Sequence, residues 1–340
     1  MKALLGLTLA DLQALCKERN YPGYTARQLA EWLYKKQVTE IDAMTNLSVA
    51  VRKALSETYH VGRSAPENVM VSTDGTKKYL FPAGTTHCVE SAWIPSPNRN
   101  TLCISSQVGC RMGCSFCMTA RQGFQKHLPA GEIINQISSL PERDGLTNVV
   151  YMGMGEPLDN PDAVMKSLEI LTADWGFGWS PSRITVSTIG VIPALSRFLR
   201  ESRCHLAISL HSPFSEERRE LMPMQKAYPL EELIPILRSF DFGLQRRVSF
   251  EYILFGGVND SPRHAKALAN LIKGMNARVN LIHFHPIPNS PLVPAQEKEM
   301  LAFQKTLSEN RIIATIRSSR GLDIMAACGM LSTKHALKQD

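Results

Sequence analysis

Three closely spaced cysteines are the part of this sequence most able to do chemistry. Cys110, Cys114 and Cys117 follow the spacing Cys-x3-Cys-x2-Cys. They supply three thiolates, one fewer than a closed four-cysteine cluster or a structural zinc site requires. A cluster bound in this way keeps one iron open for a further ligand. The spacing therefore predicts an iron–sulfur site that can bind a small molecule and pass it an electron.

A zinc site completed by a histidine is the alternative interpretation of the same loop. His127 or His211 would have to supply the fourth ligand, because no second pair of cysteines or histidines lies at zinc-knuckle spacing. The other scattered cysteines match no motif, and we expect them to pack as small apolar side chains; these are Cys16, Cys88 and Cys204.

Length, charge and composition limit the class of protein. A chain of 340 residues suits one large enzymatic domain with a small accessory domain. Its formal net charge of +7 suits a polyanionic partner, although charge alone does not establish one. No run approaches the ~18 consecutive apolar residues of a membrane span. The first residues lead directly into an amphipathic pattern, so we expect no signal peptide. We expect a cytoplasmic protein without membrane contact, in which reduced thiols serve metal binding or catalysis.

The beginning of the chain reads as three short helices. Thr8 precedes the apolar series of the first helix, and Thr25 opens a predicted capping box for the second. A third helix is expected to begin near Ser48, with Arg52 and Lys53 facing outward.

Changes of pattern divide the chain into four predicted parts. Residues 1–62 would form a helical accessory domain that binds RNA. Residues 63–96, where short strands with turn signals replace the helices, would form a β-hairpin linker. Residues 97–330 would form the catalytic domain, and residues 331–340 a polar, frayed tail.

The predicted catalytic domain alternates short apolar strands with helical stretches. Repeated βα units imply a parallel sheet, and their number suits a full or partial barrel more than a small Rossmann unit. In such barrels chemistry occurs at the carboxyl ends of the strands, where the unusual residues of this sequence lie. Strands are expected at 101–105, 148–152, 183–187, 205–210, 248–254, 279–284 and 312–316, with helices at 131–140, 230–240 and 264–275 among the segments between them.

Several motifs resemble those of a known superfamily. The cysteine spacing, with Phe116 before the last cysteine, resembles the radical S-adenosylmethionine (SAM) superfamily, and GMGEP at 153–157 resembles its second, SAM-binding motif. Longer runs are similar to the RNA methyltransferase family that contains RlmN and Cfr: TLCISSQVGC at 101–110, VST at 186–188, SLH at 209–211, GVND at 257–260 and DIMAACG at 323–329. This resemblance covers essentially the whole chain, and it implies an α/β fold with a radical SAM, partial TIM-type parallel β/α barrel.

The resemblance also implies a reaction. Members of the RlmN group methylate C2 of an adenosine in the peptidyl-transferase region of 23S rRNA and commonly C2 of a tRNA anticodon-loop adenosine. Cfr methylates C8, which remains the alternative within this class; a zinc-stabilised RNA-binding protein is the alternative from another class. The implied cofactors are one [4Fe–4S] cluster per chain and two SAM molecules per turnover. The implied partners are 23S rRNA, tRNA and an electron donor such as flavodoxin, with the protein acting as a monomer.

Family resemblance assigns roles to two further cysteines and one glutamate. Cys328 would take a methyl group from one SAM by nucleophilic displacement, and a radical from a second SAM would activate that methyl for addition to C2. Cys103 would release the product by forming a disulfide with Cys328, and Glu90 would remove the C2 proton. Without the family, both cysteines would be interpreted as small buried hydrophobic residues and Glu90 as a solvated hairpin residue.

The family pattern also carries SAM contacts over to this chain. RlmN proteins commonly have Asn-Pro at the end of one strand, where this chain has His285 and Pro286. Histidine can donate or accept a hydrogen bond as asparagine does, so His285 is predicted to make this contact, with Asn289 as the alternative. The remaining predicted contacts are Gly155, Glu156, Ser187, Ser209, His211 and the backbone of Leu210.

Overall fold

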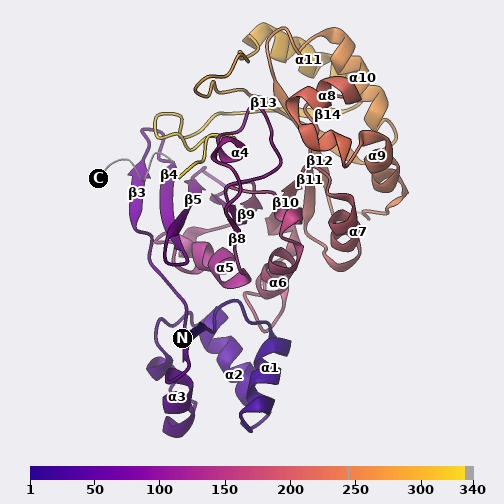
Figure 1. Cartoon of the computed structure of the whole chain (residues 1–340). Coiled ribbons are helices and arrows are strands. Elements are labelled where there is room, and N and C mark those ends of the chain that lie inside the picture. Colours follow the sequence, from indigo (N-terminus) through magenta and orange to yellow (C-terminus); the bar gives the residue numbers. More distant parts are fainter. Residues whose placement is uncertain (244, 334–340) are drawn as a thin grey trace.

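A helical module and a partial β/α barrel make up the computed structural model, which describes residues 1–243 and 245–333 (Figure 1). The predicted tail therefore lies outside the described residues from position 334 onward. In the described part of the chain, no helix combines the length and apolar character needed to cross a membrane.

The N-terminal module contains the three predicted helices. Thr8 caps the first through a reciprocal capping box with Asp11, and the Ser48 side chain caps the third. The capping box predicted at Thr25 is wrong, because the Thr25 amide already bonds to Pro22 O at 2.9 Å and Thr25 is itself helical. The elements are β1 (Lys2–Ala3), α1 (Leu9–Glu18), α2 (Thr25–Ala30), the π-helical turn η1 (Glu31–Lys35), η2 (Ile41–Ala43), α3 (Val49–Ser56) and β2 (Tyr59–His60).

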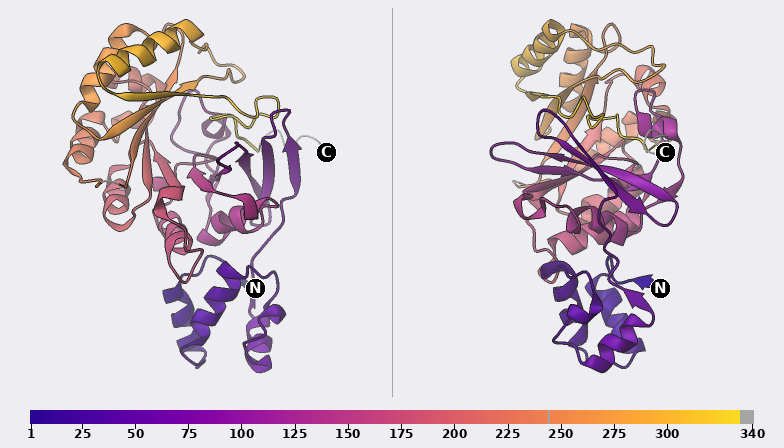
Figure 2. Two further views of the ribbon diagram at one scale, coloured as in Figure 1. Left: turned by 180° about the vertical axis from the view of Figure 1, so that it is seen from behind. Right: turned by 90° about the vertical axis from the view of Figure 1, so that its left-hand side faces the viewer.

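Seven parallel strands form the barrel wall, and helices cover its outer face (Figure 2). All seven lie at the predicted positions to within two residues. The strands are β6 (Thr101–Cys103), β9 (Asn148–Tyr151), β10 (Ile184–Thr188), β11 (His205–Ser209), β12 (Val248–Leu254), β13 (Ala277–His283) and β14 (Ile313–Arg317).

The helices that pack on the outside follow the strands in chain order. Their inward faces are apolar, and the buried side chains of the barrel and of the N-terminal module form one continuous core. The outer helices are α5 (Ala130–Ser138), α6 (Pro161–Thr172), α7 (Ile192–Glu201), α9 (Leu230–Ser239), α10 (Pro262–Ile272) and α11 (Glu297–Glu309). Short elements complete the loops: β7 (Gln107–Val108), α4 (Met118–Gln122), β8 (Lys126–His127), η3 (Arg143–Gly145), η4 (Pro157–Asp159), η5 (Pro181–Arg183), α8 (Ser215–Leu221) and η6 (Pro223–Lys226).

The predicted hairpin linker is a three-stranded antiparallel meander that extends the barrel sheet. Its strands are β3 (Asn68–Val71), β4 (Lys77–Ala83) and β5 (His87–Ile94), and β5 pairs with β6. A separate linker is therefore not what the structure shows. The reason is local: Ala92 on β5 packs with Cys103. β4 and β5 bury side chains in the catalytic domain, whereas β3 is exposed.

The C-terminal segment 318–333 crosses to the meander near the open side of the barrel, as both views in Figure 2 show. The Asp323 carboxylate accepts hydrogen bonds from Ser72 Oγ at 2.6 Å and from the Thr73 amide at 3.1 Å. The predicted start of a frayed tail at residue 331 is wrong, because residues 331–333 are buried. Thr119 Oγ1 donates to Leu331 O at 2.7 Å and so binds this segment to α4.

Candidate active site

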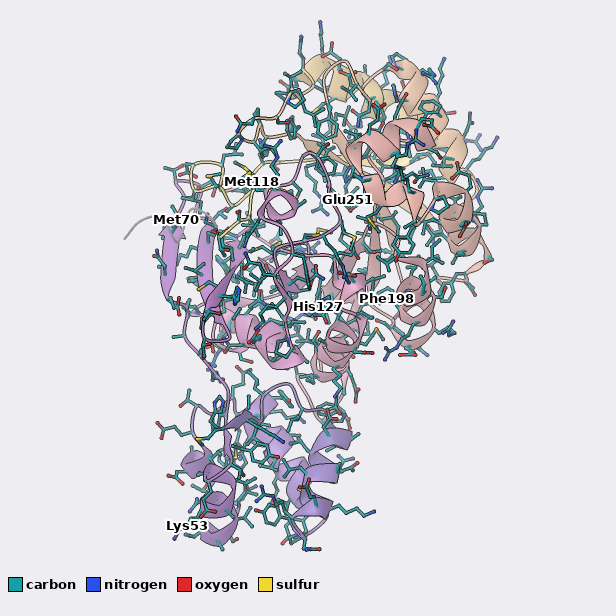
Figure 3. The ribbon with its side chains drawn as sticks, in the orientation of Figure 1. Lys53, Met70, Met118, His127, Phe198 and Glu251 are labelled. Carbon is teal, nitrogen blue, oxygen red and sulfur yellow. The ribbon has the colours of Figure 1, made fainter. Side chains whose placement is uncertain are left out.

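A cavity of about 500 Å³ lies inside the barrel and reaches the carboxyl ends of the strands. Cys110, Cys114 and Cys117 line it, and so do Cys103 from β6 and Cys328 from the C-terminal segment. The structure thus brings together five cysteines that are spread over most of the catalytic domain. Figure 3 labels Met118, which begins α4, and Glu251, which lies on the wall of the cavity on β12.

The cysteine loop is positioned by contacts at both of its ends. It lies between β7 and β8, which pair antiparallel, so its two ends are close together. Gly109 has a φ of +71°, and a Cβ there would lie 1.7 Å from Gly123 O, so only glycine fits. Farther along, the Ser115 amide donates to Leu221 O at the end of α8 at 3.0 Å. The loop backbone is therefore held without any contribution from the thiols.

The three loop thiols fit a cluster whose iron atoms take one thiolate each. In residues 1–243 and 245–333, no three metal-ligating side chains converge closely enough to hold a single ion. Burial raises the pKa of the Cys110 thiol to about 12, and burial also raises the pKa of Cys114. A buried thiol of this kind becomes a thiolate when a metal binds it. His127, proposed for the zinc alternative, does not line the cavity and contacts Gln107 instead.

The GMGEP turn after β9 lies beside the cysteine loop. Gly155 has a φ of +96°, and a Cβ would lie 2.5 Å from the Gln107 side chain. The Glu156 carboxylate is buried and accepts hydrogen bonds from the amides of Leu158 and Ile189, both at 3.0 Å. Burial raises the pKa of Glu156 to about 7, against the opposing effect of its hydrogen bonds. Gly155 and Glu156 both line the cavity, as predicted for SAM contacts.

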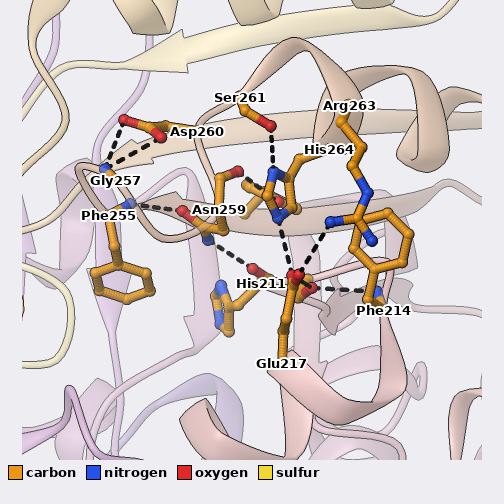
Figure 4. A network of polar contacts seen from close by, with 12 residues as sticks. His211, Phe214, Glu217, Phe255, Gly257, Asn259, Asp260, Ser261, Arg263 and His264 are labelled. Atoms are coloured by element: carbon orange, nitrogen blue, oxygen red, sulfur yellow. Dashed lines mark hydrogen bonds and ion pairs between the residues drawn. The ribbon is translucent and has the colours of Figure 1, made fainter.

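His211 presents a hydrogen-bond donor to the cavity. Its Nδ1 accepts from the Ile253 amide at 3.0 Å, so Nε2 carries the proton in the neutral ring. Burial, and then the charge of Arg218, lowers the pKa of His211 to about 3, which keeps the ring neutral. The backbone φ of His211, +58°, is unusual for a residue other than glycine. Asn259 stabilises this conformation, because its Nδ2 donates to His211 O at 2.6 Å (Figure 4).

Other polar contacts anchor the segment that follows His211. Glu217 on α8 accepts from Ser212 Oγ at 2.9 Å and contacts His264 Nε2 on α10 at 2.8 Å. His264 Nδ1 in turn contacts Ser261 Oγ at 2.7 Å (Figure 4). The network joins α8 to α10 and so fixes the end of β11, which carries Ser209, and the residues directly after it, which include His211.

The two cysteines outside the loop face the same space. Cys328 is accessible from the cavity, while Cys103 is buried on β6 below it. Burial, and then the nearby Cys328, raises the pKa of Cys103; burial raises the pKa of Cys328, and Arg317 opposes that effect. Both are free thiols in this structure. The Met118 amide donates to Gly329 O at 2.8 Å, which holds the residue after Cys328 against α4.

Glu90 is one predicted site residue that the structure does not bring to the cavity wall. Its carboxylate is buried, with Oε1 3.0 Å from Lys78 Nζ and Oε2 accepting from the Ser332 amide at 2.9 Å. The C-terminal segment therefore covers Glu90 in this conformation.

Leu210 is also absent from the cavity wall. Strand alternation turns its side chain away, its amide donates to Glu251 O at 3.0 Å, and its carbonyl accepts from Arg218 Nε at 3.2 Å. The predicted contact through the Leu210 backbone is therefore not supported. Of the alternatives His285 and Asn289, His285 lines the cavity and Asn289 does not.

Sequence reasoning missed several polar residues of the site. Glu251 lines the cavity, and its Oε1 accepts from Ser249 and Asn280 while Oε2 lies 3.8 Å from Arg317. The fully buried Arg218 donates to Ile189 O at 2.8 Å and to Ser209 O, at the carboxyl end of β11, at 3.2 Å. A polar residue every second position along an otherwise apolar strand was the available signal for Glu251 and Asn280.

Comparisons with known proteins agree with this geometry. Residues 104–269 match the model of the radical SAM superfamily, and residues 2–61 match the ribosomal RNA large subunit methyltransferase N-terminal domain. The chain is 56% identical over 330 residues to a probable dual-specificity RNA methyltransferase RlmN of Bacteroides thetaiotaomicron, covering 97% of this chain and 96% of that protein. The chain belongs to the RlmN family.

Two further relatives extend this result. The RlmN dual-specificity RNA methyltransferase of Syntrophus aciditrophicus is 42% identical, over 96% of this chain and 95% of its own length. The crystal structure of a radical SAM methyltransferase from Sphaerobacter thermophilus matches with a TM-score of 0.90 and 39% identity, covering 97% of this chain and 99% of the other. The fold of that solved structure, N-terminal module and radical SAM domain together, is thus shared along almost the whole length of this chain.

Proposed function

We propose that this protein is a radical SAM methyltransferase that methylates C2 of adenosine in 23S rRNA and tRNA. The observation that carries the proposal is the placement of Cys103 and Cys328 on the wall of the cavity that the three loop cysteines line. A generic radical SAM enzyme needs only the loop cysteines. Two additional facing thiols suit a reaction in which one sulfur carries the methyl group and the other displaces it.

In this proposal Cys110, Cys114 and Cys117 bind a [4Fe–4S] cluster. The cluster and SAM together supply a carbon radical that removes a hydrogen atom from a methyl group. Gly155, Glu156, Ser187, Ser209, His211 and His285 would hold SAM; each lines the cavity, and neutral His211 offers its Nε2 proton as a donor.

The remaining residues handle the methyl group and the proton. The Cys328 thiolate takes a methyl from one SAM, and after addition to C2 the Cys103 thiolate attacks the Cys328 sulfur to release the product. Glu90 can take the C2 proton only after the Ser332 amide releases its carboxylate. Release of the product thus requires segment 331–333 to shift.

The helical module, residues 1–62, would contact the RNA outside the cavity. It lies at the end of the molecule away from β13 and β14, and Lys53 is at its outer end (Figure 3). Its match to an N-terminal domain of ribosomal RNA methyltransferases supports this role. The catalytic unit would then be residues 97–330 together with the meander.

We further propose a cytoplasmic monomer that receives electrons from a donor such as flavodoxin. RNA substrates support the cytoplasmic location.

A nucleoside analysis tests the proposal. Cluster-loaded protein would be incubated with methyl-deuterated SAM, a reductant, and transcripts of a 23S rRNA fragment and a tRNA. We expect 2-methyladenosine in both RNAs by mass spectrometry and none with Cys328→Ala. Formation of 8-methyladenosine would instead support the C8 alternative. Zinc in place of iron and sulfide in anaerobically isolated protein would support an RNA-binding protein and contradict the proposal.

A further inference from the structure

Basic side chains gather at the end of the barrel opposite the cysteine loop. Parallel strands begin at this end, which we call the lower mouth and define by Arg99, His205, Arg247 and Arg278. Arg99 lies two residues before β6, His205 begins β11, Arg247 directly precedes β12, and Arg278 is the second residue of β13. The lower mouth is therefore formed from four segments that are far apart in the sequence.

These side chains face the barrel interior. Residues two apart on a strand share one face of the sheet, and the Leu206 amide donates to Arg247 O at 2.9 Å, so Arg247 still belongs to the ladder. Arg99 itself lines the cavity. Each of the other three lies an even number of positions from residues that line the cavity, and so on the same face of the sheet. His205 shares its face with Ser209, Arg247 with Glu251 and Ile253, and Arg278 with Asn280 and Ile282.

No carboxylate balances this charge. Throughout the part of the chain that the structure describes, Arg99, Arg247 and Arg278 make no ion pair. Glu251, an inward carboxylate farther along the barrel, is engaged by Ser249, Asn280 and Arg317. The adjacent guanidinium of Arg246 is already bound to backbone carbonyls, including Cys204 O at 3.0 Å.

The grouping gives the lower mouth a positive potential that faces solvent, because Arg99, Arg247 and Arg278 are all exposed. Barrel interiors are usually filled by branched apolar side chains, whereas arginines close together repel one another. Burial, followed by the charges of Arg247, Arg99, Arg246 and Arg278, lowers the pKa of His205 to about 4. A hollow of about 170 Å³ remains between Arg246, Arg247 and Arg278. An anion placed in this hollow would relieve the repulsion.

We propose that the lower mouth binds phosphodiester groups of the RNA on either side of the target adenosine, an inference that rests on the proposed function. The cavity runs from Arg99 at the lower mouth to Cys328 and the cysteine loop. In the proposed function SAM would occupy the loop end, so the nucleotide would enter from the other end. Its base then reaches Cys328 while its flanking phosphates stay among the arginines, as in enzymes that act on an extruded base.

The salt dependence of RNA binding tests this proposal. Full-length, cluster-loaded protein would bind a labelled tRNA anticodon stem–loop, with fluorescence anisotropy measured over a range of salt concentrations. Each lost phosphate contact reduces the slope of log K against log salt by about 0.7 to 0.9. We expect Arg247→Gln with Arg278→Gln to reduce the slope by about 1.5 and to weaken binding of unrelated RNA sequences to the same extent. Arg99→Gln should reduce it further.

Matched variants separate the phosphate site from general effects. Arg197→Gln removes one positive charge from the outer face of α7, where Asp162 and Glu201 already pair with Arg197, and should leave the slope unchanged. Arg247→Lys with Arg278→Lys keeps the charge and should retain most of the slope. The double variant Arg247→Gln with Arg278→Gln and the variant Arg197→Gln should both bind SAM as the unmodified protein does. Such binding would show that the barrel is folded.

The possible results are distinguishable. An unchanged slope in the double glutamine variant, when the unmodified protein binds RNA, would overturn the phosphate site and leave the proposed function standing. An equal loss per charge removed in Arg197→Gln would also overturn it, because the effect would follow net charge alone. An unmodified protein that does not bind RNA would overturn the proposed function together with the site.

Discussion

The side chain of Asn259 holds the backbone of His211 in its left-handed conformation. Asn259 Nδ2 donates to His211 O at 2.6 Å and to Ile253 O at 2.7 Å, and Asn259 Oδ1 accepts from the Phe255 amide at 2.7 Å. Asn259 is fully buried, so no water replaces these bonds in the folded protein. One side chain thus joins the end of β11 to the end of β12.

Replacement of Asn259 by alanine should therefore affect both stability and SAM binding. Three backbone groups would lose a buried partner, and we expect the free energy of unfolding to fall by about 2–4 kcal/mol in urea titrations. SAM affinity, measured by calorimetry, should fall as well because His211 is no longer held. Asn310→Ala is the control, since its side-chain bond to Thr306 O is exposed. Equal effects of the two substitutions would contradict the positioning role.

His211 should make stability depend on pH. Its folded-state pKa is about 3, below the ordinary value of 6.5, so at intermediate pH the unfolded chain takes up a proton that the folded chain does not. The stabilisation is complete above about pH 6.5 and is lost as the pH falls toward 3, by up to about 1.4 kcal/mol per unit. Asparagine tolerates positive φ, so His211→Asn should unfold with a shallower loss between about pH 7 and about pH 5.

A comparison of the two proteins isolates His211 from other titrating groups. Glu156 acts in the opposite direction, because its raised pKa of about 7 gives stabilisation that is lost as the pH rises from its ordinary value of 4.5 through 7. That contribution is present in both proteins and cancels in the difference. Parallel stability curves for His211→Asn and the unmodified protein would rule out the effect.

Two glycines next to the cysteine loop allow a matched steric test. Gly109 and Gly123 both have positive φ. A Cβ added at Gly109 would lie 1.7 Å from the carbonyl oxygen of Gly123, whereas a Cβ added at Gly123 would have no atom within 4 Å. Gly123→Ala should cost about 1–3 kcal/mol from backbone strain alone, because Gly123 has a φ of +79° and a ψ of 159°, a conformation that is essentially restricted to glycine. Gly109→Ala should displace the loop and lower the iron content and visible absorption of the reconstituted protein. Similar iron contents in the two variants would contradict the clash.

The sequence predicted most of the barrel because each strand is a short apolar run that depends mainly on its own residues. The cysteine loop and the GMGEP turn are likewise contiguous in the sequence, so both motifs could be recognised without knowledge of the fold. The capping box at Thr25 failed because Pro22 and Tyr24 had already started the turn, which no rule on Thr25 alone reveals.

Other features were not predictable because they depend on contacts between distant segments. The role of Asn259 requires β11 and the loop after β12 to be adjacent. The meander could not be distinguished from a free hairpin until the pairing of β5 with β6 was known. Glu90 accepts a hydrogen bond from the amide of Ser332, which lies 242 positions later in the sequence. The residues around either partner therefore do not predict the contact.

Replacement of Cys103 by alanine should trap the enzyme on its substrate. The variant removes the thiol proposed to attack Cys328 and leaves Cys328 and the loop cysteines on the cavity wall unchanged. The methyl group would still be transferred to Cys328 and joined to adenine C2, but no thiolate would be present to displace the sulfur, and water is a poor attacker at a thioether. We expect a protein–RNA crosslink to accumulate, visible as a shifted band on a denaturing gel.

The site of the crosslink provides the decisive measurement. After nuclease digestion, peptide mass spectrometry of Cys103→Ala should find a nucleotide on the peptide that contains Cys328, and Cys328→Ala should give neither S-methylated protein nor crosslink. Cys204→Ala is the matched control, because Cys204 is buried and outside the cavity, and it should turn over normally. Normal turnover of Cys103→Ala, or an adduct on another residue, would contradict the two-cysteine mechanism. The assignment of the cluster would survive that result, because it depends on Cys110, Cys114 and Cys117 alone.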